Sequence, residues 1–471
     1  MVEPDADAPR RMPHIYALLA GFIGLAAVAT HLLPAGAYTR TPGPNGRITL
    51  DASSYRLVEG DPASLLDLLL AIPKGLSSAR EVVFFTLMIG GMFAVLRRAG
   101  VIELGVRGLS RRFARHGLAL LAVLMVAFGA IATLIGTQEL SLVYVPVILP
   151  VVIALGFDSV TAAGVALCAT TAGFMSGVLN PINTGLGQQL SGLPLYSGAP
   201  FRAVAFVALL AAAMGFVLRY ARRLSKDPEG SFVADLSEEA SKRALHRGAI
   251  PTEARETPAR LWGAVAVAFA LGATLVWGIL AQRWFMNEMS GMFIVTGAAV
   301  GLVAGLGVEQ TCRAFDEGFR EVLAGALIAG VARGVAVVLE DGLVLDTLIH
   351  GLGTLVGGLP TLVSAVGMYF CQLGFNFVVP SGSGQALVTM PIMAPLADLL
   401  GVTRQTAVLA YQLGDGAGNI LYPTSGYFMA TLGVAGVPWE RWVRFFLPIF
   451  FTWMGISVGL LAFAQATGWT G

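Results

Sequence analysis

Polar residues and prolines interrupt two long apolar stretches of this chain, and these interruptions carry side chains that could bind a small ligand. The stretch 159–193 contains Asn180-Pro181-Ile182-Asn183-Thr184-Gly185, and 405–436 contains Asp415-Gly416 and then the polar segment 419–426. Proline removes a backbone donor and frees a carbonyl. A helix unwound there offers free carbonyls at one half-helix end and free amides at the other, so it can hold a cation beside an anionic group. The alternative is a kinked helix that only adjusts packing.

Two further stretches place polar residues between apolar arms. The stretch 118–156 has arms on either side of Gly136-Thr137-Gln138-Glu139, and 361–397 has arms around Pro380-Ser381-Gly382-Ser383-Gly384-Gln385. Each pattern predicts a helical hairpin with a polar tip. Within lipid, non-helical backbone persists only where it faces protein or a water-filled cavity. Tips at membrane depth therefore predict a cavity, whereas tips in the headgroup region would be ordinary loops.

Three ionisable residues fall within apolar stretches, namely Glu139, Asp415 and Arg333. Each costs roughly 2.5–3.5 kcal/mol at the centre of a transmembrane helix unless it is paired. Arg333 could bind a substrate carboxylate in a bidentate pair, or it could neutralise Glu139 or Asp415. Either carboxylate could in turn carry a coupled ion or serve only in structural pairing.

The tips and helix breaks together define a candidate site of neutral oxygen and amide ligands. Such ligands suit Na⁺ or a proton better than a soft metal. The candidate substrate-binding residues are Thr137, Gln138, Asn180, Asn183, Thr184, Arg333, Ser381, Ser383, Gln385, Asn419, Thr424 and Ser425. The candidate coupling-ion residues are Glu139, Asp415, Asn180 and Ser381.

Composition places these residues in a membrane protein. The chain has 471 residues, of which 13% are charged and 56% hydrophobic, whereas soluble domains carry about 25% charged residues. These values exclude a soluble enzyme. The net charge of +1, without a basic face, excludes nucleic-acid binding. The three cysteines, Cys168, Cys312 and Cys371, form neither a disulfide framework nor a zinc site and are expected to be packing residues.

Apolar stretches of about 17–25 residues can span the hydrocarbon core. The candidate spans lie at about 15–33, 81–97, 118–134, 141–156, 159–193, 201–219, 261–281, 289–308, 322–338, 361–397, 405–436 and 445–466. With a cytoplasmic N-terminus, 21 of the 30 basic residues fall on the inside. The polar segment 221–260 is then cytoplasmic, and 34–80 is an external loop whose short apolar stretch Leu65–Leu70 lies at the interface.

The two halves of the chain share a pattern. Pro146 and Pro194 in the first half correspond to Pro391 and Pro438 in the second, at offsets of 245 and 244 residues. Chance coincidence is the alternative in a chain with 58 Gly and 23 Pro. On the predicted topology 81–97 and 322–338 run in opposite directions, which predicts an inverted repeat with a substrate site at the membrane midplane. We therefore predict an all-α polytopic membrane protein with two hairpins and two broken transmembrane helices. Its predicted domains are a first repeat (1–220), a cytoplasmic linker (221–260), a linking transmembrane helix (261–288) and a second repeat (289–471).

Several of these strings resemble the anaerobic C4-dicarboxylate carrier-like family. They are 380–386, 390–397, 414–416 and 423–426 in the second half, with 72–75, 90–91 and 180–181 in the first. The resemblance implies membership of the ion transporter superfamily, whose members are usually dimers with scaffold and transport domains, and by analogy elevator-type alternating access. Members are variously assigned to dicarboxylates, short-chain fatty acids and basic amino acids, so the substrate does not carry over. The chain also lacks the Ser-Asn-Thr motifs of better-known dicarboxylate transporters at both tips.

We predict a cation-coupled secondary transporter of a small carboxylate or amino acid in the cytoplasmic (inner) membrane. The alternatives are an exchanger of basic amino acids or dicarboxylates, and a passive channel. An intramembrane enzyme is not expected, because none of the five histidines lies in an apolar stretch beside a plausible partner. No Walker A string is present, so ATP-driven transport by this chain alone is not expected either. The expected partners are the substrate, the lipid bilayer and a second copy of the chain. Na⁺ or H⁺ is the expected coupling ion, and no cofactor is expected.

Overall fold

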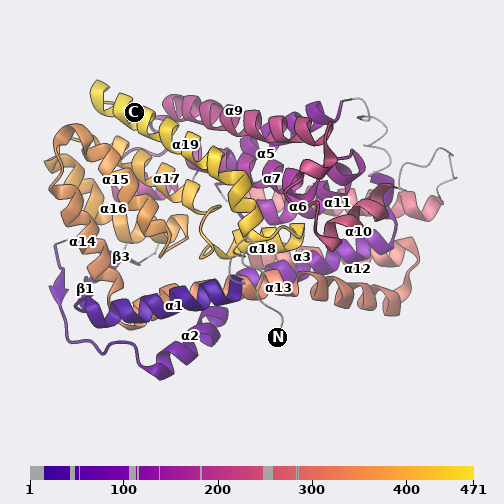
Figure 1. Cartoon of the computed structure of the whole chain (residues 1–471), viewed down its shortest axis with the longest axis horizontal. Coiled ribbons are helices and arrows are strands. Elements are labelled where there is room, and N and C mark those ends of the chain that lie inside the picture. Colours follow the sequence, from indigo (N-terminus) through magenta and orange to yellow (C-terminus); the bar gives the residue numbers. More distant parts are fainter. Residues whose placement is uncertain are drawn as a thin grey trace, which may run out of the picture.

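The computed structural model describes residues 15–42, 48–51, 53–105, 113, 116–136, 138–180, 183–247, 258–282, 284 and 286–471. Helices dominate this part of the chain (Figure 1). The first half contains α1 (Ile15–Leu32), α2 (Leu65–Ser78), α3 (Arg80–Arg98), α5 (Gly117–Ile135), α6 (Leu140–Ala154), α7 (Ser159–Ser176), α8 (Thr184–Leu190) and α9 (Ala199–Leu224). The linker contributes a short 3-10 helix, η2 (Pro228–Gly230), and α10 (Ser237–Arg247). The rest contains α11 (Ala259–Gln282), α12 (Met286–Ala304), α13 (Gly307–Asp341), α14 (Leu345–Gly357), α15 (Thr361–Asn376), α16 (Gly382–Leu399), α17 (Arg404–Gly418), α18 (Gly426–Ala435) and α19 (Trp439–Thr467).

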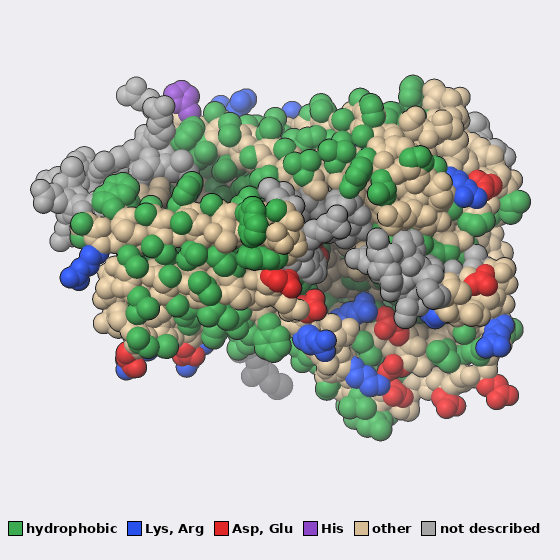
Figure 2. Space-filling model, turned by 180° about the vertical axis from the view of Figure 1, so that it is seen from behind, with side chains coloured by type: hydrophobic (Ala, Val, Ile, Leu, Met, Phe, Trp, Pro, Cys, Tyr) green, Lys and Arg blue, Asp and Glu red, His purple; other side chains and the backbone are tan. Residues whose placement is uncertain are grey.

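These helices have the length and composition of membrane spans. Among the described residues, six helices could each cross a membrane, and the number rises to eight if each of two bent helix pairs counts as one span. One such pair is α2 and α3, which meet at 57°. Figure 2 shows hydrophobic side chains spread over much of one face, with most acidic and basic side chains toward its lower margin. The predicted all-α membrane protein is confirmed.

The helices pack in two groups. In one, α13 lies against α3, α2, α1 and α12, and α11 lies against α12. In the other, α7 packs on α5, α6 and α9, while α17 packs on α15, α16 and α19. The two groups meet where α18 contacts both α13 and α6. In Figure 1, α9 and α19 lie along one edge of the molecule, and α1 and α2 lie along the opposite edge.

Small residues bring α5 and α7 close together. Every residue of α7 is buried, and the helix is rich in Ala, Gly, Ser and Thr. Gly173 faces the backbone of α5, where an added Cβ would lie 2.2 Å from the Gly129 carbonyl oxygen. Helix packing of this kind is typical of membrane proteins, in which small residues let backbones approach. It gives α7 a fixed position at the centre of its group.

The segment between α1 and α2 contains two short antiparallel strand pairs, β1 (Gly36–Ala37) with β4 (Arg56–Leu57) and β2 (Arg40–Pro42) with β3 (Ile48–Leu50). Asp346 of α14 holds the segment, since its carboxylate accepts from the Tyr38 backbone N–H at 2.9 Å and pairs with Arg40. The Tyr55 ring stacks on His350 with ring centroids 3.9 Å apart. The segment predicted as a loop is therefore attached to α14.

The structure corrects several predicted boundaries. Asp415-Gly416 was expected to interrupt a helix, but α17 continues to Gly418. Gly416 serves close packing instead, because an added Cβ would lie 2.3 Å from Met175 Cγ. The second tip is shorter than predicted, since α16 begins at Gly382 with Ser381 as its N-cap. Helices α2, α10 and α14 lie where no helix was predicted, and α2 packs on α13 although its residues were expected to belong to an external loop. Cys312, expected to be a packing residue, is exposed, while Cys168 and Cys371 are buried.

Candidate functional site

A cavity of about 340 Å³ lies where the two groups of helices meet. Both hairpin tips and the segments that interrupt α7–α8 and α17–α18 reach it, together with the ends of α2 and α3 and parts of α12 and α13. Its lining residues are Ser78, Ala79, Glu81, Val82, Gly136, Gln138, Glu139, Phe174, Asn183, Met286, Arg333, Pro380, Ser381, Gly382, Ser383, Asn419, Thr424, Gly426 and Tyr427. The polar tips thus border a cavity, as the hairpin interpretation requires.

The first tip is bonded to a helix of the other half. The buried Gln138 amide donates to the Gly416 carbonyl at 3.2 Å and to the Thr171 hydroxyl at 3.0 Å. Because Gly416 lies in α17 and Thr171 in α7, one side chain connects the tip to both interrupted helices. Buried polar groups bonded in this way fix a single arrangement of the backbone.

Asn183 makes the reciprocal connection at the break between α7 and α8. Its amide donates to the Gly136 carbonyl of the first tip at 2.9 Å, and its backbone N–H donates to Asn180 Oδ1 at 2.9 Å. The second tip also reaches it, because an added Cβ on Gly382 would lie 2.6 Å from Asn183 Oδ1. Gly136 has a φ of +75°, and an added Cβ there would lie 2.1 Å from Asn180 Oδ1. Glycine is therefore required at both tips by close approach.

Among the described lining residues three are charged, the carboxylates of Glu81 and Glu139 and the guanidinium of Arg333. Arg333 was predicted to pair with Glu139, Asp415 or a substrate. Of the protein carboxylates, the structure pairs it with Glu340, two turns along α13 at 3.2 Å, rather than with Glu139 or Asp415, and it also donates to the Ser78 hydroxyl at 3.2 Å. Its binding of a substrate carboxylate stays a prediction. Its side chain is 30% exposed, so it is less buried than predicted.

Asp415 lies behind the cavity and is fully buried. Its Oδ1 accepts from the Asn376 amide at 2.9 Å and from the Asn419 amide at 3.3 Å, while its Oδ2 has no hydrogen-bond partner among the described residues. Glu139 and Tyr427 lie close enough to interact with it electrostatically. A buried carboxylate oxygen with no donor is costly unless a proton or a cation reaches it.

Helix N-termini also point toward the cavity. α16 begins at Gly382 and α18 at Gly426, and both residues line it. The first N–H groups of a helix lack intrahelical partners, and the helix dipole adds partial positive charge there. These two ends can therefore bind the carboxylate of a ligand.

The structure brings most of the predicted site residues together. Gln138, Glu139, Asn183, Arg333, Ser381, Ser383, Asn419 and Thr424 line the cavity. Asn180, Thr184, Gln385, Asp415 and Ser425 are buried in the surrounding core instead. Thr137 lies outside the described residues.

Sequence reasoning missed several lining residues. Glu81 is the most important of them, and its position at the start of an apolar stretch, within Arg80-Glu81-Val82, was the available signal. Asn376 does not line the cavity but donates to the Asp415 carboxylate, and it was also missed, although it is a polar residue at the end of an apolar hairpin arm. Nothing in the sequence pointed to Ser78, Phe174, Met286 or Tyr427. Among the described residues no group of three or more His, Cys, Asp or Glu side chains could hold a metal ion.

Comparison with known proteins places the chain in a family. The model of the DcuC family, described as C4-dicarboxylate anaerobic carrier, matches residues 12–466. A protein of Escherichia coli K12 named "Putative basic amino acid antiporter YfcC" is 34% identical over 78% of this chain and 74% of its own length. An uncharacterized protein of Haemophilus influenzae is 29% identical over 84% of this chain and 77% of its own length. The YdaH transporter of Alcanivorax borkumensis, a solved structure, covers 97% of this chain and 99% of its own at 17% identity and a TM-score of 0.40, a likeness too weak to transfer its topology or site.

Proposed function

The chain belongs to the C4-dicarboxylate anaerobic carrier family and is a multi-pass secondary transporter of the inner membrane, and from this premise we propose that it carries amino acids with a cationic side chain. The transport is coupled to a cation or to the exchange of a second substrate. It is a transporter and not an enzyme, as predicted.

The charge of the cavity carries the proposal. Glu81 and Glu139 both line it, and Arg333, whose guanidinium is the only one among the described lining residues, already pairs with Glu340. A dicarboxylate would bring two further negative charges beside these carboxylates, and like charges placed together cost several kcal/mol. Arginine or lysine instead brings two cationic groups and one carboxylate, which complement the lining. The relative named for basic amino acid antiport agrees with this choice.

The same cavity offers a place for the substrate α-carboxylate. The N-termini of α16 and α18 supply backbone N–H groups, and the Ser381 and Ser383 hydroxyls lie beside the first of them. Arg333 of α13 adds a guanidinium to the cavity lining. In this arrangement the α-carboxylate lies toward the helix ends, and the cationic groups lie toward Glu81 and Glu139.

Asp415 and Glu139 are the proposed coupling-ion residues. The Oδ2 of Asp415, which has no hydrogen-bond partner in the described part of the chain, supports this role, as does the nearby Glu139 carboxylate, because two neighbouring carboxylates favour a shared proton or cation. The buried hydroxyl of Thr424, which has no hydrogen-bond partner among the described residues, could complete an oxygen site for Na⁺ together with the buried Ser425 hydroxyl.

We further propose the inverted repeat, with first repeat 1–220, linker 221–260, linking helix 261–288 and second repeat 289–471. Two sets of contacts support antiparallel broken helices. Arg404 at the start of α17 donates to the Ser191 carbonyl after α8 at 2.8 Å, and Lys242 joins the start of α7 to the end of α18. An elevator movement of the core, a cytoplasmic N-terminus and a homodimer complete the proposal. The family resemblance supports the elevator and the dimer, and the distribution of basic residues supports the orientation.

Counterflow in proteoliposomes tests the substrate. Vesicles loaded with unlabelled arginine, lysine or succinate should accumulate labelled arginine only with a basic amino acid inside, and a Na⁺ or proton gradient should change the rate. Uptake of succinate without uptake of arginine or lysine would reject the proposal in favour of a dicarboxylate carrier, the alternative that the family name supports. Equilibration without transient accumulation would indicate a passive channel.

A further inference from the structure

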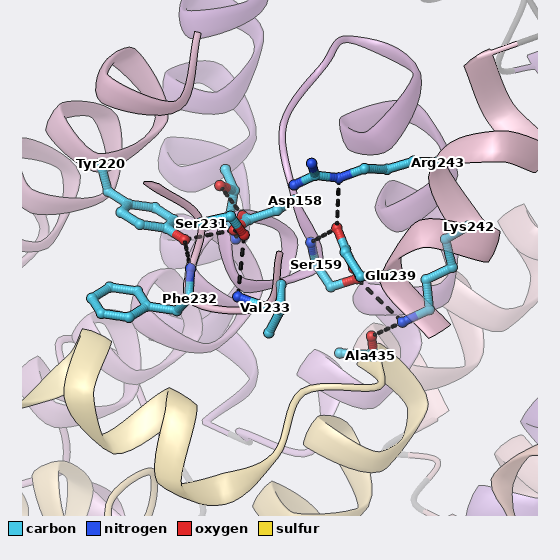
Figure 3. A network of polar contacts seen from close by, with 11 residues as sticks. Asp158, Ser159, Tyr220, Ser231, Phe232, Val233, Glu239, Lys242, Arg243 and Ala435 are labelled. Carbon is cyan, nitrogen blue, oxygen red and sulfur yellow. Dashed lines mark hydrogen bonds and ion pairs between the residues drawn. The ribbon is translucent and has the colours of Figure 1, made fainter. Parts of the chain in front are cut away.

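The linker helix α10 is anchored to the ends of two helices that lead to the cavity. It is a polar helix with Glu238 and Glu239 in its first turn, yet the Glu239 side chain is only 1% exposed. Figure 3 shows Glu239 and Lys242 directed at Ser159 and Ala435, which belong to different halves of the chain. Buried charged groups are uncommon unless they are paired, so this contact is specific.

Glu239 caps the first turn of α7. One carboxylate oxygen accepts from the Ser159 backbone N–H at 3.2 Å and the other accepts from the Ser159 hydroxyl. The buried Asp158 carboxylate accepts from the Thr161 backbone N–H at 2.7 Å. Both carboxylates satisfy N–H groups that lack intrahelical partners and interact favourably with the helix dipole.

Lys242 caps the other helix. Its ammonium donates to the carbonyl of Ala435, the last residue of α18, at 2.7 Å and to the Ser159 hydroxyl at 3.2 Å. A cation at a helix C-terminus is stabilising. Gly436 leaves room for it, because an added Cβ would lie 2.3 Å from the Lys242 nitrogen. One side chain thus joins α7 to α18.

The segment before α10 is bound at the same place. The second oxygen of Asp158 accepts from the Tyr220 hydroxyl at 2.5 Å and from the Ser231 hydroxyl at 2.7 Å, and the Tyr220 oxygen accepts from the Phe232 N–H at 3.1 Å (Figure 3). An ion pair of 2.7 Å between Asp235 and Arg441 attaches the linker to the start of α19.

Both capped helices lead from this network to the cavity. α7 runs from Ser159 to the break before Asn183, and α18 begins at Gly426 beside Thr424. We propose that Glu239 and Lys242 are positioning residues, which lock the far ends of α7 and α18 together so that the linker moves with both helices as one unit during transport. The inference rests on the proposed function, because it assumes that transport moves this core. The competing arrangement is a linker that must detach in each cycle.

A reversible cross-link between Asp235 and Arg441 separates the two arrangements. Their side chains are 60% and 28% exposed, and neither lines the cavity. Cysteines at both positions, in a chain lacking Cys168, Cys312 and Cys371, would be bridged with a short bifunctional thiol reagent that can be cleaved by reduction. We expect the bridged transporter to exchange arginine within twofold of the unbridged rate. A fall to background that reduction reverses would overturn the proposal.

Substitutions of Glu239 and Lys242 supply the second measurement. Glu239→Gln and Lys242→Met should each lower the maximal exchange rate per folded molecule at least fivefold while KM stays unchanged, and Glu229→Gln, an exposed change in the same linker, should not. Folded protein would be quantified by size-exclusion chromatography. Wild-type exchange rates per folded molecule in both Glu239→Gln and Lys242→Met would overturn the proposal.

A third readout does not require the correct substrate. A cysteine replacing Ser383, which lines the cavity, can be labelled from each side of the membrane in the bridged and unbridged Asp235/Arg441 proteins. If the substrate assignment fails, exchange is absent from every variant, but labelling still reports movement of the core. Equal labelling with and without the bridge supports a linker that moves with the core, and loss of labelling from one side on bridging overturns it.

Discussion

Replacing Glu81 by glutamine removes one of the two carboxylates that make the cavity suitable for a cationic substrate. The side chain keeps its shape and remains in the first turn of α3, where its present contact to the Asn287 amide is long, at 3.5 Å. Loss of a charge near a helix N-terminus costs about 0.3–1 kcal/mol, so the protein should fold. The principal effect should therefore fall on the substrate.

The expected magnitude follows from the contact that is lost. A hydrogen bond between charged groups contributes about 1.5–3 kcal/mol, and a partly exposed carboxylate in a water-accessible cavity belongs at the lower end of this range. A loss of about 1.5 kcal/mol corresponds to about a tenfold weaker affinity. Arginine and lysine should therefore show a KM about tenfold higher in Glu81→Gln. A neutral amino acid or a dicarboxylate should be unaffected or bind more tightly.

The assay is counterflow of labelled arginine with unlabelled competitors, using protein matched for reconstitution. Glu309→Gln is a suitable control, because Glu309 is 76% exposed on α13 and pairs only with its neighbour Arg313 among the contacts described. An unchanged arginine KM in Glu81→Gln would refute the reasoning. So would a parallel loss of affinity for neutral and cationic substrates, which would indicate a distorted cavity rather than a missing charge.

Four further predictions follow from the same geometry. Arg333→Lys keeps the charge but loses the planar guanidinium that can bind a carboxylate with two hydrogen bonds, so the substrate KM should rise about tenfold if Arg333 binds the substrate carboxylate. An unchanged KM in counterflow would show that Arg333 serves only in the ion pair with Glu340. Asp415→Asn should reach the membrane and still exchange substrate, but its uptake should no longer respond to a Na⁺ or proton gradient; a normal gradient response would exclude it as the coupling residue. Thr424→Ala, which removes a hydroxyl from the cavity wall, should strongly weaken uptake although the variant protein is present in the membrane at the wild-type amount. Normal uptake would indicate that the break between α17 and α18 is only a kink. Burial, with the Asp346 carboxylate nearby, raises the pKa of Tyr38 to about 12 from an ordinary value of 10. The attachment of Tyr38 and Arg40 to α14 should therefore be complete below pH 10 and weaken as pH rises toward 12; limited proteolysis should show this loss, and Tyr38→Phe should abolish its pH dependence.

The membrane architecture was predictable because it depends on local composition. Few charges and long apolar stretches determine that helices form across the membrane, since lipid offers no partner for an unpaired backbone group. The helix break before Asn183 and the tip at Gly136 were visible because Pro, Gly and polar residues rarely stand in such stretches without a reason. Local pattern failed where a residue had another use, as at Gly416, which permits close packing rather than a break.

The sequence could not say which polar residues face the cavity, because that depends on contacts between segments far apart in the chain. Asn419 lines the cavity while Asp415, one turn earlier on the same helix face, is buried behind it. Glu81 and Glu139 border one cavity because α3 and the first tip meet there, which no local spacing encodes. The linker composition indicated a solvated connection, but Glu239 is buried because only the folded core brings the start of α7 and the end of α18 within reach of one helix. The composition and length of the apolar stretches thus determined that helices form across the membrane. Long-range packing decided where their charged side chains lie, because the electrostatic environment of a side chain is set by its neighbours in space rather than in sequence.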